Sequence, residues 1–185
     1  ESLLGDGETV VCFDNLGSGR RTNVAPFEDL DRFTFVEGDV RADLATELDR
    51  GGVPVSDVDR IYHLASRASP VDFGEHPQEI LETNSIGTRN VLELAADVDA
   101  SVLYASTSEV YGDPEETPQT LEYNGNVDCR GERACYDEAK RFGETLCVTY
   151  EDRHGVDVRT VRIFNTYGPR MRPDDGRVVP TFARQ

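Results

Sequence analysis

A tyrosine and a lysine four residues apart, Tyr136 and Lys140, are the side chains in this sequence best suited to proton transfer. Residues at this spacing share one face of a helix, so a phenol and an ammonium there can address the same bound molecule. A free tyrosine has a pKa of about 10, and it must fall by roughly three units, or ~4 kcal/mol, to act as a base near neutral pH. A neighbouring ammonium favours the phenolate and would supply part of that shift.

The use of lysine strengthens this interpretation. The spacing Y-x-x-x-K occurs by chance on many helices, so it is weak evidence alone. Lys140, however, is the only lysine of the chain, and every other basic residue is arginine. A sequence that avoids lysine everywhere else points to a function for the one it keeps.

A second polar group, Ser106-Thr107-Ser108-Glu109-Val110-Tyr111-Gly112, stands at the end of the apolar run at residues 101–106. If that run is a parallel strand, the group lies at the edge where open α/β sheets bind ligands. A hydroxyl there can bond a substrate hydroxyl and the catalytic phenol, and Glu109 can transfer a proton. A Ser/Thr-rich turn that caps a helix is the alternative interpretation. The predicted catalytic residues are therefore Tyr136, Lys140, Thr107, Ser108 and Glu109.

Asp14 ends the apolar run at residues 8–14 and precedes the glycine-rich turn at residues 15–19. In dinucleotide-binding sheets an acid at such a strand tip holds the adenosine ribose. It also repels a 2′-phosphate, which favours NAD over NADP, although the Arg20-Arg21 pair acts the other way. The alternative interpretation is an exposed aspartate in an ordinary turn, which would give the same local sequence.

Several weaker groups follow the expected path of a dinucleotide. They are Gly38-Asp39-Val40, residues 63–66 (HLAS) and Thr83-Asn84; within the second, His63 is interpreted as a strand residue rather than a base. After the last apolar run, Asn165 and an arginine cluster suit a pyrophosphate or a sugar. That cluster comprises Arg170, Arg172 and Arg177.

The hydrophobic pattern predicts the elements that must position these side chains. Short apolar runs at 8–14, 33–37, 58–65, 101–106 and 156–164 are typical of strands, and segments 41–50, 77–98 and 132–154 are typical of helices, the last ending at Gly155. Strands that are apolar on both faces and alternate with helices predict an α/β fold with a doubly wound parallel sheet, Rossmann-like. The aperiodic stretch 113–131 is a long loop, which in a compact domain is usually functional.

Composition excludes several classes of function. The formal charge is −17, from 36 acidic and 19 basic residues, so we expect no nucleic-acid or membrane partner. Four cysteines without a C-x-x-C pair predict no metal site and a reduced, cytoplasmic protein. The acid excess with almost no lysine indicates adaptation to high salt, although a GC-rich genome that favours arginine codons would give the same bias.

The ends of the sequence also carry expectations. Residues 1–7 read as the last turn of a helix and a turn, and a dinucleotide-binding sheet needs a first strand and a glycine-rich loop before that helix. We therefore expect residues 1–177 to be an NAD-binding Rossmann-like domain that lacks its first strand and that loop. Residues 178–185 are expected to begin a substrate-binding region of which the rest is absent.

Taken together, the motifs resemble the extended short-chain dehydrogenase/reductases of the NAD-dependent epimerase/dehydratase family, which act on nucleotide sugars. In order along the chain they read D-N-L-x-S-G, G-D-V, H-L-A-S, T-N-x-x-G-T, S-T-S-E-V-Y-G, Y-x-x-x-K and R-I-F-N-T-Y-G-P-R, and they cover nearly all of it. Within that family the motif sequences are most similar to those of the UDP-glucuronate decarboxylases (UDP-xylose synthases). The segments responsible are 63–70, 133–141 and 162–179.

The resemblance implies bound NAD, with Asp14, Asn15, Leu16, Gly17, Ser18, Asp39, Val40, Leu64, Ala65, Ser66, Asn84, Tyr136, Lys140 and Phe164 holding it, and Asn165, Arg177 and Ser69 contacting the nucleotide sugar. It implies that Tyr136 deprotonates the sugar C4 hydroxyl while Lys140 lowers the pKa of Tyr136. Thr107 orients the C4 oxygen, and Ser108 and Glu109 guide decarboxylation of the 4-keto intermediate and its reprotonation. NAD is regenerated, and UDP-glucuronate becomes UDP-xylose.

Three alternatives stay open. dTDP-glucose 4,6-dehydratases and UDP-glucose 4-epimerases share the Tyr/Lys pair, and a non-catalytic NAD-binding module could share the fold. The resemblance also implies a homodimer, formed through a four-helix bundle that includes the helices at 77–98 and 132–154.

Overall fold

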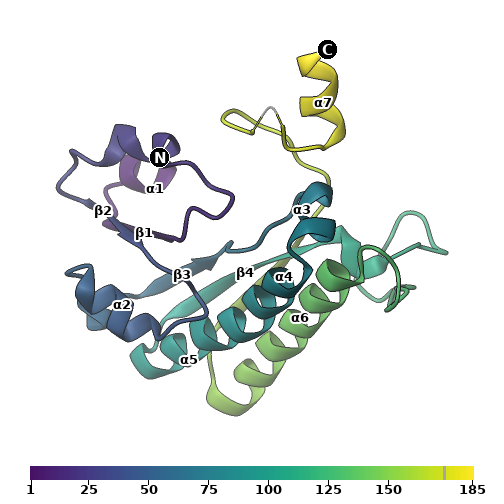
Figure 1. The fold of residues 1–185 in the computed structure, drawn as a ribbon. Helices are drawn as coiled ribbons and strands as arrows, with labels where there is room; N and C mark the ends of the chain where they lie inside the picture. Colours follow the sequence, from purple (N-terminus) through teal and green to yellow (C-terminus); the bar gives the residue numbers. More distant parts are fainter. Residues whose placement is uncertain (173) are drawn as a thin grey trace.

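Five strands form two parallel sheets in the computed structural model, which describes residues 1–172 and 174–185 (Figure 1). Strands β1 (Val10–Asp14) and β2 (Phe33–Glu37) make one sheet. Strands β3 (Arg60–His63), β4 (Ser101–Thr107) and β5 (Val158–Ile163) make the other, with β4 in the centre. Every described pair is parallel. The carboxyl ends within each sheet therefore meet at one edge, where parallel sheets carry their ligand sites.

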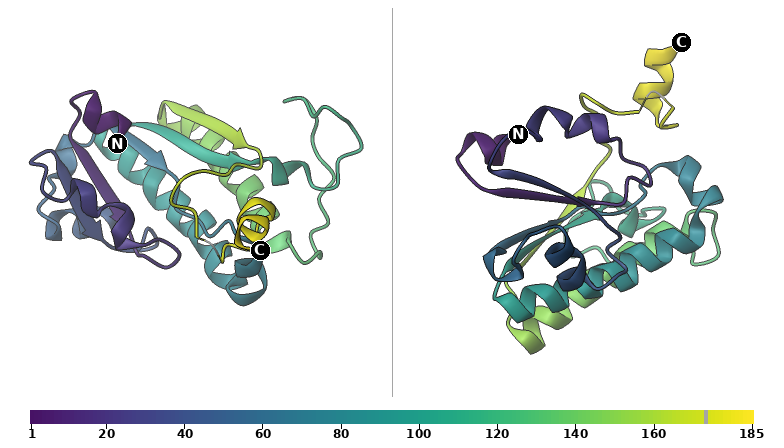
Figure 2. Two further views of the ribbon diagram at one scale, coloured as in Figure 1. Left: turned by 90° about the horizontal axis from the view of Figure 1, so that it is seen from above. Right: turned by 60° about the vertical axis from the view of Figure 1, so that its left-hand side comes forward.

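α-Helices lie in three of the four connections between the described strands, and one more precedes β1 and one follows β5. They are α1 (Ser2–Gly5), α2 (Leu44–Arg50), α3 (Pro70–Glu75), α4 (Pro77–Glu82), α5 (Thr88–Val98), α6 (Ala134–His154) and α7 (Val178–Arg184). A π-helical turn, Thr83–Gly87, joins α4 to α5, and the 3₁₀ turn η5 (Ser108–Tyr111) follows β4. Helices α5 and α6 run side by side along one face of β3–β4–β5 (Figures 1 and 2).

The main core lies between this sheet and α5 and α6. Leu92, Val102 and Tyr104 are at most 2% exposed and meet there with Cys147. Each buried side chain of this size contributes roughly 1.5–3 kcal/mol. On the other face of the sheet Tyr62, Val161 and Ile163 are exposed. The strands are thus packed mainly from one side within the described residues.

The predicted elements are largely confirmed, with shifts at their ends. The strand at 33–37 lies where predicted, β4 is one residue longer than predicted, and the other three strands are shorter. Helix α6 ends at Gly155, whose φ of 73° is the left-handed conformation expected of a helix stop.

Three expectations about elements were wrong. The helix predicted at 77–98 is broken by the π-helical turn, and α3 was not predicted. The residues of β1 are half-buried or exposed, and most of β5 is exposed, so these strands are not the fully buried ones that their apolar letters suggested. An apolar pattern shows that a surface can be covered, but not which neighbour covers it.

The C-terminal segment reaches back over α3. Helix α7 stands away from both sheets (Figures 1 and 2). The Ser69 hydroxyl, at the start of α3, donates to the carbonyl of Asp175. Gly176 has a φ of 82°, and a Cβ there would lie 2.6 Å from Val71. These contacts set the position of the segment that carries Arg177.

Candidate active site

Tyr136 and Lys140 lie on the buried face of α6 beneath the carboxyl end of β4. They are 6% and 3% exposed. The Lys140 Nζ donates to the Ala105 carbonyl at 2.8 Å and stands 5.0 Å from the centre of the Tyr104 ring and 5.9 Å from that of Tyr136. The four-residue spacing therefore brings the ammonium and the phenol to one place at the end of the central strand.

Burial acts on both members of this pair. It lowers the pKa of Lys140 to about 8. Burial also raises the pKa of Tyr136; hydrogen bonding to Thr107 lowers it, Glu109 and Asp137 raise it, and Arg177 lowers it. The low pKa that a tyrosine base needs is therefore not present in the ligand-free chain. The positive charges nearby must act together with whatever binds.

The turn after β4 brings two of the predicted catalytic residues to this phenol. Thr107 ends the strand and caps η5. Its Oγ1 accepts a hydrogen bond from the backbone N–H of Glu109 at 3.2 Å. The Thr107 hydroxyl also lowers the pKa of the Tyr136 phenol, and the charge of Glu109 raises it. Ser108 lies between them, half-buried in the same turn.

Further side chains form the walls around Tyr136. Phe73 of α3 stacks on its ring with 4.9 Å between the centroids. Arg133, one turn earlier, forms an ion pair with Glu109 and lies over Phe73. Asp137 is buried with one carboxylate oxygen unpartnered, and burial raises its pKa to about 6. The phenol is thus enclosed by an aromatic ring and by charges of both signs.

The carboxyl edge of β1 and β2 gathers the residues predicted to bind the adenosine end of a cofactor. Asp14 accepts from the backbone N–H of Leu16 at 2.7 Å, and Asn15 accepts from that of Gly17 at 3.0 Å. The Asn15 amide donates to Asp39 at 3.3 Å. Arg41 also bonds Asp39 and holds the pKa of that carboxyl at about 2. Asp14 stays exposed, and Ser18 follows in the same turn.

The residues after β3 show two different environments. Leu64 is 61% exposed, while Ala65 and Ser66 are half-buried. Asn84 is fully buried, and its amide donates to Ser66 at 3.0 Å and to the Ile80 carbonyl at 2.8 Å. Asn84 therefore ties Ser66 to α4.

Val40 belongs to this region as well. Its side chain would lie 2.6 Å from a Cβ at Gly87 of the π-helical turn. The close approach fixes the loop after β2 against that turn.

The predicted residues after β5 are also divided. Phe164 is 54% exposed, and Asn165 follows it, exposed, at the same edge. Arg177 pairs with Asp175 at Nη2···Oδ2 2.9 Å and influences the Tyr136 phenol electrostatically. Ser69 is buried, and its hydroxyl is taken by the Asp175 carbonyl.

The other two arginines of the predicted cluster also have carboxylate partners. Arg170 pairs with Glu1 at 3.2 Å, and Arg172 pairs with Asp174 at 3.7 Å. Of the three, only Arg177 acts on the catalytic phenol.

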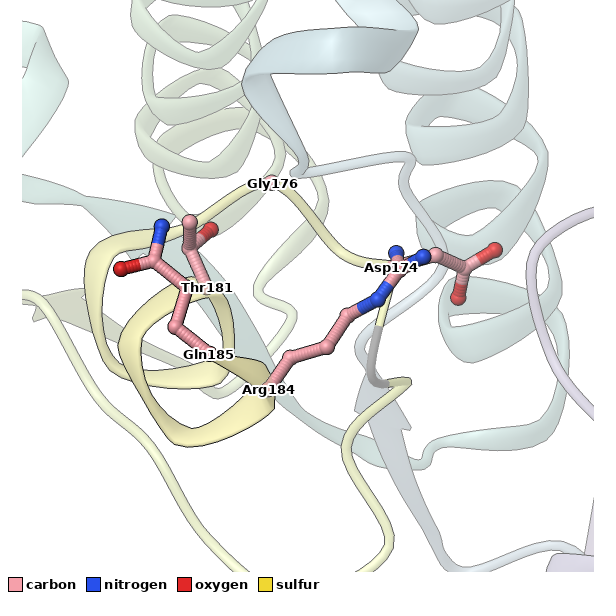
Figure 3. Close-up of a pocket in the computed structure, with 5 residues that line it drawn as sticks. All are labelled: Asp174, Gly176, Thr181, Arg184 and Gln185. Carbon is pink, nitrogen blue, oxygen red and sulfur yellow. The ribbon is translucent and has the colours of Figure 1, made fainter.

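Two hollows of about 350 Å³ each lie on the C-terminal segment. Figure 3 shows the first, lined by Asp174, Gly176, Thr181, Arg184 and Gln185, with Arg184 reaching toward Asp174. Neither hollow is lined by Tyr136, Lys140 or Thr107. The chemistry is therefore indicated by the side chains at the end of β4, and not by these two hollows.

Other kinds of site receive no support from the described part of the chain. It contains no group of three or more His, Cys, Asp or Glu side chains placed to hold a metal ion. None of its helices is long and apolar enough to cross a membrane.

Four residues around the catalytic turn received no role in the sequence analysis, although three of them, Ser106, Tyr111 and Arg162, lie within its motifs. Ser106, Tyr111, Glu144 and Arg162 form one hydrogen-bonded network there. Glu144 carried a signal that went unused, because it lies four residues after Lys140 and so on the same helical face. The others depend on strand pairing across β4 and β5, which spacing alone does not give.

The residues at this edge fit a dinucleotide. Asp14 offers an exposed carboxylate at the end of β1, and Leu64 and Phe164 offer exposed apolar surface at the ends of β3 and β5. The buried amide oxygen of Asn84 has no partner within the described chain. A carboxylate for a ribose and apolar surface for flat rings are what such a ligand requires.

Comparison with known proteins agrees with this geometry. Residues 1–185 match the profile described as the NAD dependent epimerase/dehydratase family. The chain is 49% identical over 185 residues to UDP-glucuronic acid decarboxylase 1 of Xenopus tropicalis and 48% identical over 185 residues to UDP-glucuronic acid decarboxylase 1 of Arabidopsis thaliana. The two alignments cover 100% of this chain, and 42% and 40% of the relatives. The chain thus spans about two fifths of the length of these curated relatives.

A solved structure supports the fold. The dTDP-glucose 4,6-dehydratase of Streptomyces venezuelae, crystallised with NAD, superposes with a TM-score of 0.81 at 30% identity. The match covers 98% of this chain and 55% of that one. The parallel α/β architecture is therefore that of Rossmann-fold, NAD-dependent epimerases and dehydratases.

Proposed function

Because the chain belongs to the NAD-dependent epimerase/dehydratase family, we propose that it is the NAD-binding and catalytic part of a UDP-glucuronate decarboxylase, which makes UDP-xylose. The observation that carries the proposal is the grouping of Tyr136, Lys140 and Thr107 at the end of β4. Identities of 49% and 48% to two UDP-glucuronic acid decarboxylases support the choice of substrate.

In the proposed reaction this chain's residues move and hold protons at the sugar. Tyr136 removes the proton of the C4 hydroxyl, and Thr107, which lowers the pKa of that phenol, orients the C4 oxygen. Once C4 is a ketone, the C6 carboxylate is β to it and leaves as carbon dioxide. Glu109, which forms an ion pair with Arg133, would return a proton to the sugar.

Bound NAD would supply a hydride acceptor and donor for C4. Asp14 and Asn15 would hold its adenosine ribose, and Leu64, Phe164 and Lys140 would line its other end. Lys140 contributes a buried positive charge that favours the phenolate form of Tyr136. The remaining predicted contacts to cofactor and sugar (Leu16, Gly17, Ser18, Asp39, Val40, Ala65, Ser66, Asn84, Ser69, Asn165 and Arg177) belong to the same proposal.

A second candidate function has a specific observation in its favour. The similarity to a dTDP-glucose 4,6-dehydratase, at 30% identity, leaves a dehydratase as the first alternative to a decarboxylase, and a UDP-glucose 4-epimerase shares the same first step. A non-catalytic NAD-binding module is disfavoured because both Tyr136 and Lys140 are kept.

The test gives UDP-glucuronate to the whole protein and follows carbon dioxide release and the sugar product by NMR. We expect UDP-xylose, and we expect Tyr136→Phe to lower turnover by at least about 10²-fold because the proton acceptor is gone. Tyr62→Phe, which changes an exposed tyrosine of β3, is the control and should leave turnover unchanged. Turnover of dTDP-glucose or UDP-glucose in place of UDP-glucuronate would reject the decarboxylase, and a fully active Tyr136→Phe would reject the mechanism.

The proposal includes a homodimer that buries apolar side chains on α4, the π-helical turn and α6. Leu81, Ile86, Phe142 and Val148 are exposed there. Sedimentation of the whole protein should give a dimer, and Phe142→Glu with Val148→Glu should weaken it. Leu121→Glu, in the loop at 113–131, is the matched control. A wild-type protein that sediments as a monomer at micromolar concentration would exclude the dimer.

The proposed setting is the cytoplasm of a cell with high internal salt. The four cysteines are free, which suits a reducing compartment. A net charge of −17 with one lysine suits high salt. Recovery of the protein from the membrane or secreted fraction of its source cells would contradict this placement.

A further inference from the structure

Glu144 of α6 and Arg162 of β5 form a two-pronged ion pair behind the catalytic turn. The Arg162 Nε donates to Glu144 Oε1 at 2.9 Å, and its Nη2 donates to Oε2 at 2.8 Å. The side chains are 19% and 23% exposed. Parallel bonds of this kind between a guanidinium and a carboxylate fix direction as well as distance.

Each partner holds a further residue of the strand and turn that carry Thr107 and Glu109. The Ser106 hydroxyl donates to Glu144 Oε1 at 2.5 Å. The Arg162 Nη1 donates to the Tyr111 phenol at 2.8 Å, and the guanidinium lies 4.8 Å from the centre of that ring. The pair thus hydrogen-bonds the residue immediately before Thr107 and also the last residue of η5.

A third bond completes the grip from the same helical face. Lys140, one turn before Glu144, donates to the Ala105 carbonyl at 2.8 Å. Residues 105 and 106 are therefore tied to α6, the helix that carries Tyr136. The end of β4, which leads into Thr107, is thus held against the helix that carries Tyr136.

We propose that Glu144 and Arg162 are positioning residues, which hold the segment from Ser106 to Tyr111 so that Thr107 and Glu109 face the Tyr136 phenol. The inference deepens the proposed function and rests on it for the chemistry that Thr107 and Glu109 perform. Neither Glu144 nor Arg162 is required to touch substrate.

The charge and shape of the pair suit this role. Burial raises the pKa of Glu144, but hydrogen bonds from Arg162 and Ser106 outweigh it and keep the pKa below its ordinary value. Glu144 is thus an anion throughout the neutral range, and its bonds are charge-assisted. The planar guanidinium reaches the carboxylate and the phenol at once, which a lysine could not do with the same geometry.

The experiment measures Glu144→Gln and Arg162→Lys in the whole protein. We expect kcat to fall roughly 10- to 100-fold, the range for a displacement of about 1 Å at a reacting group, with KM for the nucleotide sugar changed much less. We also expect the limb of the pH profile that reports Tyr136 to move to higher pH. Thr107 would no longer favour the phenolate, and this loss outweighs the weaker opposition of a displaced Glu109, because the effect of Thr107 is the larger of the two. Asp137 would still oppose the phenolate, and Arg177 and Lys140 would still support it.

A second measurement needs no substrate. The ultraviolet absorbance of the phenolate, taken as the difference between each protein and the same protein carrying Tyr136→Phe, gives the titration of Tyr136 directly. A wild type that fails to turn over UDP-glucuronate overturns the proposed function, whereas an unchanged Tyr136 titration in Glu144→Gln overturns the positioning role. The two failures are therefore separate.

Two further variants keep the inference falsifiable. Glu138→Gln, on the exposed side of α6, is the matched control and should change neither kcat nor the titration. Glu144→Met with Arg162→Met leaves no unpaired charge, so it should fold even where a single variant does not. If that double variant folds and Tyr136 titrates as in the wild type with full kcat, the pair is structural only.

Discussion

Lys140 keeps its charge in a place where burial works against it. Its pKa falls to about 8, against 10.5 for a free lysine. Between these values the unfolded chain binds more protons than the folded one, so stability rises with pH from about 8 to 10.5 and the full penalty applies below pH 8. About 2.5 units correspond to about 3 kcal/mol as an upper bound.

We therefore predict that Lys140→Met stabilises the fold while abolishing turnover. The expected gain at pH 7 is on the order of 1–3 kcal/mol, because the burial penalty disappears but the bond to the Ala105 carbonyl is also lost. Urea unfolding at pH 7 measures it. Repeating the measurement at pH 10 is the control, since the gain should shrink there; a variant less stable than the wild type at both pH values would contradict the prediction.

His63 is the second titratable group whose burial has a consequence for stability. It is 3% exposed, its Nε2 lies 3.0 Å from the Thr88 hydroxyl, and burial, with Lys140 nearby, lowers its pKa to about 3. The unfolded histidine titrates at about 6.5, so between these values protons bind to the unfolded chain. This group therefore removes stability as the pH falls below about 6.5.

We predict that His63→Gln, which keeps a side chain able to bond Thr88, loses less stability than the wild type between pH 7 and pH 5. The expected difference is about 2 kcal/mol, from 1.5 units of pH. Urea unfolding of both proteins at the two pH values measures it. Equal losses in the two proteins would show that other groups govern the acid side.

At the scale of residues, the sequence predicted side chains by chemical type and by helical spacing. It placed Tyr136 and Lys140 together, and Thr107 beside them, because one helix and one strand end are local features. It did not predict that Asn84 and Ser69 would be buried. Nor did it predict that the Asn84 amide would bond Ser66 and the Ser69 hydroxyl would bond the Asp175 carbonyl. Their partners lie 18 and 106 residues away, and no local pattern records such contacts.

At the scale of elements, the packing of α6 on β4 depends on one small residue. A Cβ at Gly143 would lie 2.0 Å from the Tyr104 hydroxyl oxygen and 2.6 Å from its ring. Tyr104 is completely buried, so its ring has no room to retreat. Glycine in the middle of a helix is normally a weakness, and here it permits the approach that brings Lys140 to the end of β4.

We predict that Gly143→Ala destabilises the protein by about 1–3 kcal/mol, the usual cost of overpacking, although alanine is the better helix former. In a Tyr104→Leu background, where the ring is gone, the same change should cost less, and thermal unfolding of the four proteins gives the coupling. Gly74→Ala in α3 is the control, because nothing lies within 4 Å of a Cβ there. Equal costs of Gly143→Ala in both backgrounds would show that the Tyr104 contact is not responsible.

Element types were more predictable than element neighbours. Alternation of apolar runs with helical spacing gave the five strands and the long helix, since burial imposes those periods. The break of the helix at residues 83–87 could not be read from the sequence. There the Asn84 amide bonds the Ile80 carbonyl and the turn widens to a π-helix, while apolar spacing continues on both sides. Strand pairing likewise depends on contacts distant in sequence.

At the scale of the whole molecule, the charge is spread over the surface rather than concentrated at the site. The described ion pairs use many of the arginines, most of them partly exposed, and exposed pairs contribute at most about 1 kcal/mol each. The 36 acidic residues outnumber the 19 basic ones, so by count 17 negative charges have no positive counterpart. Mutual repulsion of these charges opposes the compact state.

We predict that salt stabilises this protein at neutral pH. The screening length falls from about 10 Å at 0.1 M to about 3 Å at 1 M, so repulsion among scattered carboxylates should weaken more than the short contacts inside ion pairs. Each 1 kcal/mol gained should raise Tm by roughly 2–4 °C for a chain of this size, and thermal unfolding from 0.05 to 1 M KCl measures it. At pH 5, closer to the sequence pI of about 4.4, the repulsion is smaller and the rise in Tm should shrink. A rise of equal size at both pH values would instead indicate a general effect of salt on apolar burial, and a fall in Tm with salt would show that the ion pairs outweigh the repulsion.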